Sequence, residues 1–172
     1  GVMVLDLERN EVKDSYFELG KSGTTIAIHA SLIHNDTLYL ATDEGVKGGD
    51  LDDNLKDFNI WRHYGAGDGM PESLTRVLVS SGPALQTAFD EFGLYEYNNN
   101  SWTDLNLLKT RSFFNGSESN SGSLIVSESV VYEYASGAVD SLSFELISLP
   151  KSATYLNNLP VVGDFLNGIL FP

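Results

Sequence analysis

The sequence predicts an all-β protein made of repeated four-stranded units. Apolar residues mostly alternate with polar ones along the chain, which is the spacing of a strand with one buried face. Residues that favour turns separate these apolar runs. Similar motifs also recur about every 43 residues, a quarter of the 172-residue chain. Together these three observations predict the blades of a β-propeller.

Hairpins are predicted along most of the chain, because each pair of apolar runs is separated by a turn motif. The turns lie at residues 9–10, 34–36, 81–83 and 98–100, where Asn, Asp, Gly and Pro suit the backbone angles of tight turns. The strand pairs that they join are residues 2–7 and 12–18, 26–33 and 38–41, 77–79 and 85–89, and 94–97 and 102–105.

The last third of the chain continues the pattern. Strands are predicted at residues 124–126, 130–134, 142–146 and 165–171, with a turn at Ser136-Gly137. Residues 149–154 are predicted to form a connector because they include Pro150. The one stretch that permits a helix is short, at residues 51–57.

Internal repeats point to the architecture. Residues 41–46 (ATDEGV) align with residues 88–94 (AFDEFGL) if one residue is inserted, and residues 94–97 (LYEY) recur as residues 131–134 (VYEY). The units therefore start at about Gly1, Gly45, Gly93 and Val130. Four short strands every 40–50 residues or so are typical of propeller blades, with an ordinary β-sandwich as the alternative.

Each unit consists of an inner strand pair, a short turn and an outer strand pair. The chain starts on an outer pair (residues 1–19) and ends on an inner pair (residues 155–171), with three uninterrupted blades between them. Either the two ends meet and close a small ring, or the chain is part of a larger propeller. We expect residues 1–172 to form a single, partial propeller domain, because the sequence stops abruptly on apolar residues.

Composition argues against several classes of function. The chain has 10 basic and 24 acidic residues, a formal net charge of −14, which argues against binding to nucleic acid or to an anionic membrane surface. No apolar run approaches the ~20 residues of a membrane helix, so we expect no direct membrane insertion in this segment. The absence of cysteine excludes disulfides and thiolate chemistry.

Three motifs have the residue types of a ligand site but depart from the required pattern. Asp50, Asp52, Asn54 and Asp57 resemble the start of a calcium loop, yet Leu55 and Trp61 replace the glycine and the bidentate glutamate that such a loop needs. The other two motifs are Gly20-Lys21-Ser22, where Ser15 replaces the first glycine of a phosphate loop, and Gly65, Gly67 and Gly69, which lack dinucleotide-binding spacing. We expect an acidic insertion, a turn between blades and an interblade linker, respectively.

Histidines and aromatic residues are expected to be structural. His29, His34 and His63 are not at the spacing of zinc ligands, and we expect them at the surface or on strand edges. Trp61 and Trp102 are expected to pack the blades, with ligand stacking as the alternative. The carboxylates are too numerous for a catalytic pair to be identified, so a glycosidase-like pair stays open. We therefore name no catalytic, metal-binding or cofactor-binding residues, expect no cofactor, and leave the binding residues unassigned.

Several consecutive segments resemble a known family. Residues 1–7 (GVMVLDL), ending at Asp14-Ser15-Tyr16, are followed by residues 36–46 (DTLYLATDEGV), by residues 54–58 (NLKDF) and by Trp61. This series resembles the β-propeller of PorZ-type proteins of the type IX (Por) secretion system. The resemblance covers residues 1 to about 134.

A second resemblance is to the two-component-regulator propeller repeat. It runs from residues 68–71 (DGMP) to residues 93–97 (GLYEY), although residues 85–88 (LQTA) replace the tryptophan motif of that repeat.

The two resemblances imply different functions. The PorZ resemblance implies an exported, non-catalytic protein of the periplasm or cell surface, whose propeller is a docking platform for protein partners in cargo attachment at the outer membrane. The second implies a periplasmic sensor whose blades bind a glycan and signal to a kinase. A polysaccharide-active propeller enzyme is a third class, which no motif supports. In each case the charge predicts encounters with basic surfaces that weaken with salt.

Overall fold

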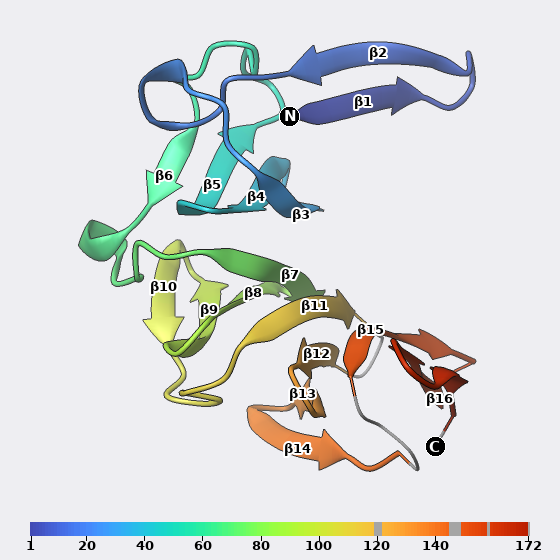
Figure 1. Ribbon diagram of the computed structural model, residues 1–172. Helices are drawn as coiled ribbons and strands as arrows, with labels where there is room; N and C mark the ends of the chain where they lie inside the picture. Colours follow the sequence, from blue (N-terminus) through green and yellow to red (C-terminus); the bar gives the residue numbers. More distant parts are fainter. Residues whose placement is uncertain (119–121, 145–148, 158, 172) are drawn as a thin grey trace.

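Short turns join most strands to their neighbours, so the sheets are antiparallel meanders. The computed structural model describes residues 1–118, 122–144, 149–157 and 159–171, and these residues form an all-β fold (Figure 1). Two-residue turns such as Asn35-Asp36, Asn99-Asn100 and Ser136-Gly137 have positive φ angles at both positions. Turns of this kind match the twist of the strands that they join, and these residue types tolerate them.

Five sheets follow one another in the described part of the chain. The N-terminal hairpin consists of β1 (Val2–Asp6) and β2 (Glu11–Tyr16). Blade 1 consists of β3 (Ile28–His34), β4 (Thr37–Thr42), β5 (Gly45–Asp50) and β6 (Arg62–Tyr64). Blade 2 consists of β7 (Thr75–Ser81), β8 (Ala84–Phe89), β9 (Gly93–Asn98) and β10 (Ser101–Asp104).

The remaining two sheets complete the array. Blade 3 consists of β11 (Phe113–Glu118), β12 (Ser123–Ser127), β13 (Val131–Ala135) and β14 (Ala138–Leu142). The C-terminal sheet consists of β15 (Pro150–Leu156), β16 (Leu159–Asp164) and β17 (Gly168–Leu170). Every blade has its strands in sequence order.

The sheets pack face to face in an arc. The first strands of consecutive sheets, β3, β7, β11 and β15, lie against one another and are therefore the innermost strands. Figure 1 shows the sheets following one another from the N-terminal hairpin to the C-terminal sheet, which stand at the two ends of the arc. Four buried apolar clusters fill the four spaces between neighbouring sheets. This arrangement confirms the predicted all-β fold of propeller blades.

The sequence pattern predicted the N-terminal hairpin and the three blades better than it predicted the C-terminal sheet. The hairpin, the three blades and the two-residue turns are confirmed. The connector predicted at residues 149–154 is wrong, because these residues belong mostly to β15, where Pro150 is the first residue and a ladder N–H is not required. The inner pair at the C-terminus is β15 and β16, and β17 adds a short third strand.

Two further predictions differ from the structure. Residues 51–57 form turns and bends rather than a helix, because the acidic and amide side chains there bond to nearby backbone N–H groups. The strand predicted at 142–146 begins earlier, at Ala138, since the Ser136-Gly137 turn joins it directly to β13; residues 145 and 146 lie outside the described residues. Strand β11 was not predicted, because its sequence FFNGSE does not alternate.

Helices play a minor part in the described residues. Two short 3₁₀ turns occur, at Lys21–Gly23 and Ala66–Asp68, and both lie in connections between sheets. Among the described residues, no helix is long and apolar enough to cross a membrane.

Candidate functional site

A β-bulge recurs at the same place in every innermost strand. The register shifts beside His29 in β3, Arg76 in β7, Phe114 in β11 and Lys151 in β15. A bulge re-aims the side chain of the extra residue. The four bulged residues therefore form a row along the inner edge of the arc, at the same end of each sheet.

The bulged residues have polar or aromatic partners. His29 Nε2 lies 2.7 Å from Asp43 Oδ1, and Arg76 Nη1 donates to Asp90 Oδ2 at 3.1 Å. Asp43 and Asp90 are equivalent residues of the repeat found in the sequence. At the other end of the row, Lys151 Nζ lies 3.9 Å from the centre of the Phe114 ring. The polar members of the row thus have an acidic or aromatic neighbour, and Asp90 compensates the charge of Arg76.

Two polar hollows lie beside the contact between blades 1 and 2. One, of about 260 Å³, is lined by Arg62, Gly67, Asp68, Asn100, Ser101 and Trp102. The other, of about 270 Å³, is lined by His34, Asn35, Pro83, Tyr97, Asn98, Asn99 and Asn100. The second consists largely of neutral amide and aromatic groups, and the first combines such groups with the charged Arg62 and Asp68. Amide, hydroxyl and aromatic groups hydrogen-bond and stack on uncharged polar ligands.

An aromatic cluster adjoins these hollows, because its Trp102 lines the first and its Tyr97 lines the second. Tyr39, Tyr64, Tyr97 and Trp102 come from both blades, with neighbouring rings 5.0–6.1 Å apart at their centres. Burial raises the pKa of Tyr39 and Tyr64 well above the ordinary value for tyrosine. Trp102 is buried as well, and its Nε1 group has no hydrogen-bond partner within the described residues. The cluster is neutral and packs the two blades together.

One ion pair borders the first hollow. Arg62 Nη2 donates to Asp68 Oδ1 at 2.6 Å, and the Arg62 guanidinium lies over the Tyr64 ring at 4.6 Å. Partial burial opposes ionisation of Asp68, but hydrogen bonds from Arg62 and from the Gly65 amide outweigh it and lower the pKa of Asp68. The pair is therefore ionised, and its charges compensate each other.

A buried lysine and a histidine lie side by side on the outer strands of blade 1. Lys47 and His63 are paired across β5 and β6. The Lys47 side chain is 4% exposed, and its Nζ lies 3.1 Å from Glu44 Oε2. Both ring nitrogens of His63 are buried without a hydrogen-bond partner within the described residues. Burial and the nearby positive charges of Lys47 and Lys21 lower the pKa of His63.

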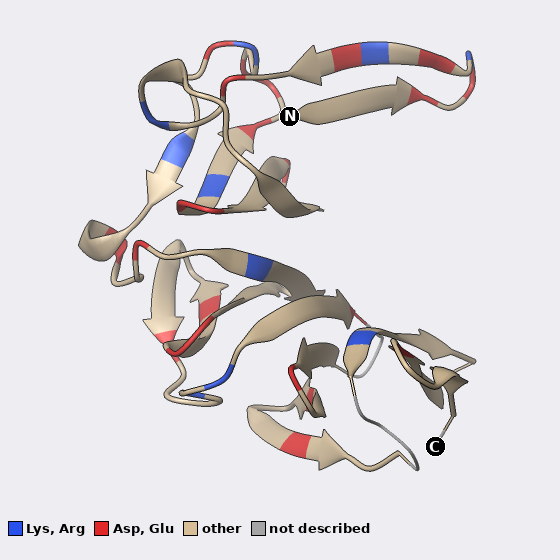
Figure 2. Cartoon of the chain, in the orientation of Figure 1, with Lys and Arg blue, Asp and Glu red and all other residues tan. Residues whose placement is uncertain are grey.

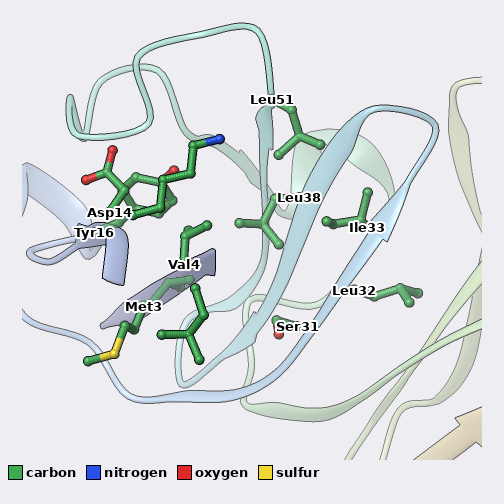
Figure 3. A pocket seen from close by; sticks show the side chains of 12 residues that line it. Met3, Val4, Asp14, Tyr16, Ser31, Leu32, Ile33, Leu38 and Leu51 are labelled. Carbon is green, nitrogen blue, oxygen red and sulfur yellow. The ribbon is translucent and has the colours of Figure 1, made fainter. Parts of the chain in front are cut away.

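An open apolar cleft lies between the N-terminal hairpin and blade 1 (Figure 3). Its volume is about 660 Å³. Figure 3 shows Met3, Val4 and Tyr16 of the hairpin on one side, and Ile33 of β3 and Leu38 of β4 on the other. Its largest lining residues are apolar, so it suits apolar side chains better than a polar small molecule.

The acidic residues of the calcium-like motif do not converge on one point. Asp50 and Asp57 each accept a hydrogen bond from a backbone N–H two residues later, Asp52 and Asn59 respectively, at 2.9 Å. Leu55 and Trp61, which break the motif, anchor this loop: both are buried, and Trp61 Nε1 donates to the Leu55 carbonyl oxygen at 3.0 Å. No group of three or more metal-ligating side chains occurs in the described ranges.

The two glycine motifs lie in connections, as predicted. Gly20 precedes the 3₁₀ turn before blade 1, and Lys21 and Ser22 belong to it. The Lys21 amide N–H there donates to the Glu44 carboxylate rather than facing an open anion site. Gly65 and Gly69 flank the 3₁₀ turn that joins blade 1 to blade 2.

The three histidines lie in blade 1, and the two tryptophans lie in blades 1 and 2. His29 is partly exposed on the inner edge, whereas His34 is buried beside the second hollow. His63 is half-buried. Trp61 and Trp102 belong to different apolar clusters, in the packing positions that the sequence predicted. The two hollows were missed in the sequence because their residues come from turns that are distant along the chain.

Charge is spread over the molecule rather than collected at one site. Figure 2 shows acidic residues in the turns and loops of successive sheets, with Lys and Arg between them. Most of the lysines and arginines lie close to carboxylates, as in Lys56–Asp14 at 3.0 Å and Lys109–Asp104 at 2.9 Å. The excess negative charge therefore acts as a broad field around the molecule.

The comparisons with known proteins agree with this geometry. Residues 1–62 match the model of the PorZ N-terminal β-propeller domain of the type IX secretion system. Among solved structures, the chain is similar to PorZ, an essential bacterial surface component of the type IX secretion system of Porphyromonas gingivalis. The TM-score is 0.71 at 17% identity, over 98% of this chain and 22% of that one. The predicted resemblance to PorZ is thereby confirmed.

Two other structures share the fold. One is the extracellular domain of the hybrid two-component system BT3049 from B. thetaiotaomicron, with a TM-score of 0.67 at 16% identity over 96% of this chain and 23% of that one. The other is the computationally designed Ika8 protein, with a TM-score of 0.62 at 12% identity over 94% of this chain and 49% of that one. A search of curated protein sequences found no significant match.

The chain spans about a fifth of the length of the PorZ and BT3049 chains. The structural similarity at identities below a fifth establishes the propeller fold alone. A shared fold does not determine activity or partners. The chain is a PorZ-like assembly of β-propeller blades.

Proposed function

We propose that this chain is a non-catalytic docking module of an exported protein that acts, like PorZ, in a type IX secretion system at the outer membrane or cell surface. The observation that carries the proposal is the match of residues 1–62 to the PorZ N-terminal propeller domain, joined to a similar fold over 98% of the chain. The partners of such a module are other proteins of the secretion assembly.

The architecture suits docking. The strands form a rigid scaffold, and the turns of several blades lie along its edges, where they can contact a large partner. The net charge of −14 favours partners with basic surfaces and speeds their encounter. Binding should therefore weaken as the salt concentration rises, and binding that salt leaves unchanged would contradict this part of the proposal.

A genetic experiment tests the proposal in a bacterium that carries the gene and a type IX system. The gene is deleted, and cargo proteins are quantified on the cell surface and in the medium. We expect cargo to be lost from the surface and restored by the wild-type gene. The empty vector is the matched control and should not restore it. Unchanged surface cargo after deletion would overturn the proposal.

A second candidate function is ligand sensing in the periplasm. The observation that favours it is the pair of polar hollows, together with the fold shared with the extracellular domain of BT3049. A sensor would bind a glycan there, so the test is titration of the purified chain with a panel of oligosaccharides by calorimetry. Saturable binding that Trp102→Ala or Asn100→Ala abolishes would favour sensing. No binding across the panel would leave docking as the better account.

A further inference from the structure

The second hollow, of about 270 Å³, is formed at three turns of blades 1 and 2: the turn after β3, the turn between β7 and β8, and the turn between β9 and β10. Its residues are His34, Asn35, Pro83, Tyr97, Asn98, Asn99 and Asn100. No Lys, Arg, Asp or Glu of the described ranges lines it. The hollow therefore joins the two blades at the ends of their strands and carries no fixed charge of its own.

The hydrogen-bonding side chains around this hollow have no partners within the described residues. His34 is 9% exposed, and its ring forms no hydrogen bond with another described residue. The side-chain amides of the four asparagines are also unbonded, because the donors that reach Asn35 and Asn98 bond to their backbone carbonyl oxygens. A neutral imidazole has one acceptor nitrogen, and each side-chain amide has an acceptor oxygen. The hollow thus offers several acceptors to a ligand.

An arginine of the chain itself packs on the same aromatic cluster. The Arg62 guanidinium, which borders the first hollow, lies 4.6 Å from the centre of the Tyr64 ring. The Tyr64 and Tyr97 rings are neighbours, with 5.8 Å between their centres, and the two hollows share Asn100. The cluster therefore binds a guanidinium at the first hollow, whereas at the second the half-buried Tyr97 has no cation beside it within the described residues.

Charge and shape favour a guanidinium over other ligands of the second hollow. The net charge of −14 attracts cations, and the exposed Asp36 follows Asn35 in its turn. A guanidinium is a planar fork of five donors that stacks on aromatic faces, which matches amide oxygens beside a tyrosine ring. A lysine ammonium group is a compact, strongly hydrated ion, and no carboxylate of the described ranges lines the hollow to replace its water. A neutral sugar bonds to amides but gains nothing from the negative field.

We infer that the second hollow binds an arginine side chain of a partner protein. The guanidinium stacks on the Tyr97 ring and donates to the side-chain oxygens of the surrounding asparagines and to the His34 ring. The inference rests on the proposed docking function and names the chemical group that the partner contributes and the place where it binds.

Titration of the ¹⁵N-labelled chain with an arginine peptide tests the inference by nuclear magnetic resonance. The probe is a capped Gly-Arg-Gly tripeptide, added at pH 8 and low salt. We expect saturable shifts of the amide signals of Asn99 and Asn100, with a Kd on the order of 1 mM, because a single side chain buries little surface. Higher salt should weaken this binding. Absence of saturable shifts at these residues would overturn the inference.

Two matched peptides separate the guanidinium from its shape and from its charge. Citrulline in place of the arginine keeps the planar shape and removes the charge, whereas lysine keeps the charge and removes the planar fork. We expect both peptides to bind about fivefold or more weakly than the arginine peptide, because each lacks part of the stacking and charge-assisted bonding. Equal binding of either peptide would show that the hollow does not recognise a guanidinium, and the inference would be wrong.

Substitutions at Asn98 test the location. Asn98 is exposed, and its φ is not positive, unlike those of Asn99 and Asn100, so the fold should tolerate a change there. Asn98→Lys places a cation at the hollow and should abolish binding of the arginine peptide. Asn98→Asp adds a carboxylate and should tighten it about two- to fivefold. The matched control is Ser141→Lys, on the outermost strand of blade 3, where the side chain is exposed and binding should not change.

The contrary outcomes separate this inference from the proposed function. If oligosaccharides shift the signals of the hollow and the arginine peptide does not, the hollow is a sugar site and the inference is wrong. The gene carrying Asn98→Lys is also introduced into the deletion strain, where we expect it to leave surface cargo low. Full restoration of cargo by this variant would overturn the inference alone, whereas surface cargo that deletion of the gene leaves unchanged would overturn the docking function itself.

Discussion

Glu96 of blade 2 accepts a hydrogen bond from the Tyr134 hydroxyl group of blade 3, with 3.2 Å between the two oxygens. The same carboxylate accepts from Gln86 Nε2 at 3.1 Å, and Gln86 Oε1 accepts from the Ser123 hydroxyl group of blade 3 at 2.7 Å. One blade further, the equivalent Glu133 accepts from the Tyr155 hydroxyl group. The repeated glutamate of the LYEY and VYEY motifs thus links blade 2 to blade 3 and blade 3 to the C-terminal sheet.

Removing this carboxylate should loosen the contact between blades 2 and 3. Glu96→Ala leaves the amide of the fully buried Gln86 and the Tyr134 hydroxyl group without their acceptor. Unpaired buried donors of this kind cost about 1–3 kcal/mol, measured as a loss of unfolding free energy in urea. Glu128→Ala is the matched control, because Glu128 is exposed in a turn of blade 3 and should change stability little. Equal losses of unfolding free energy in both variants would contradict the role of Glu96 in the contact between blades 2 and 3.

The sequence repeat identified the position of Glu96, but not the residues that bond to it. Residues 94–97 and 131–134 could be aligned because their strands have the same place in each blade. Gln86 and Ser123, which bond to each other, do not belong to a sequence motif. A polar residue on a buried strand cannot be assigned a partner from the sequence, because its partner comes from the facing sheet. For the same reason β11 was missed: its Gly116 is required by close packing, and a Cβ there would lie 2.6 Å from Val79.

Gly93, the first residue of the third strand of blade 2, should not tolerate a larger residue. Its φ is +94°, and a Cβ atom would lie 2.2 Å from the Leu107 carbonyl oxygen, which accepts the Leu94 amide N–H at 3.0 Å. Gly93→Ala should therefore destabilise the fold by more than about 1 kcal/mol, the size of the backbone strain alone. The measurement is the thermal midpoint.

Gly67→Ala is the matched control for Gly93→Ala. Gly67 lies in the linker between blades 1 and 2, a Cβ atom there meets nothing within 4 Å, and its φ is not in the left-handed region. The thermal midpoint should stay within a degree or two, or rise slightly. A larger loss at Gly67 than at Gly93 would show that the repeat glycine is not a constrained position.

Calcium should not stabilise the chain. Asp50 and Asp57 bond to the backbone of their own turns, and the buried Leu55 and Trp61 hold the loop in that form. After dialysis against a chelator, millimolar calcium should therefore leave the thermal midpoint unchanged, with magnesium as the control for ionic strength. A rise seen with calcium alone, and lost in Asp52→Ala, would show that the loop can rearrange into a cation site.

The candidate sites are formed by residues that are far apart in the sequence rather than by the sequence motifs. The motifs that the sequence singled out are turns and linkers. The first hollow instead joins Arg62 of blade 1 to Asn100 of blade 2, and the second joins Asn35 of blade 1 to Asn98 of blade 2. The apolar cleft joins residues of the hairpin to Ile33 of blade 1. Alternation along the sequence predicts which face of a strand is buried, but not which sheet covers it, so these surfaces required the three-dimensional arrangement.

Stability should fall in mildly acidic solution because of His63. Burial and the positive charges of Lys47 and Lys21 lower the pKa of His63 below 6.5, although Glu72 and Glu44 partly offset this. Above pH 6.5 the ring is neutral in both the folded and the unfolded chain. As the pH falls below 6.5, the unfolded chain takes up the proton first, so the unfolding free energy decreases until the pH reaches the pKa in the folded state. The measurement is urea denaturation between pH 8 and pH 5.

His63→Phe isolates this contribution from that of the carboxylates, which also titrate toward acid. The variant keeps a ring of similar size against Lys47 and removes the titrating group. We expect the difference in unfolding free energy between wild type and variant to shift in favour of the variant as the pH decreases from 6.5 to 5, because the variant has no histidine here for the unfolded state to protonate. A difference that is constant with pH would show that His63 is protonated equally readily in both states, and that its burial beside Lys47 does not oppose its charge.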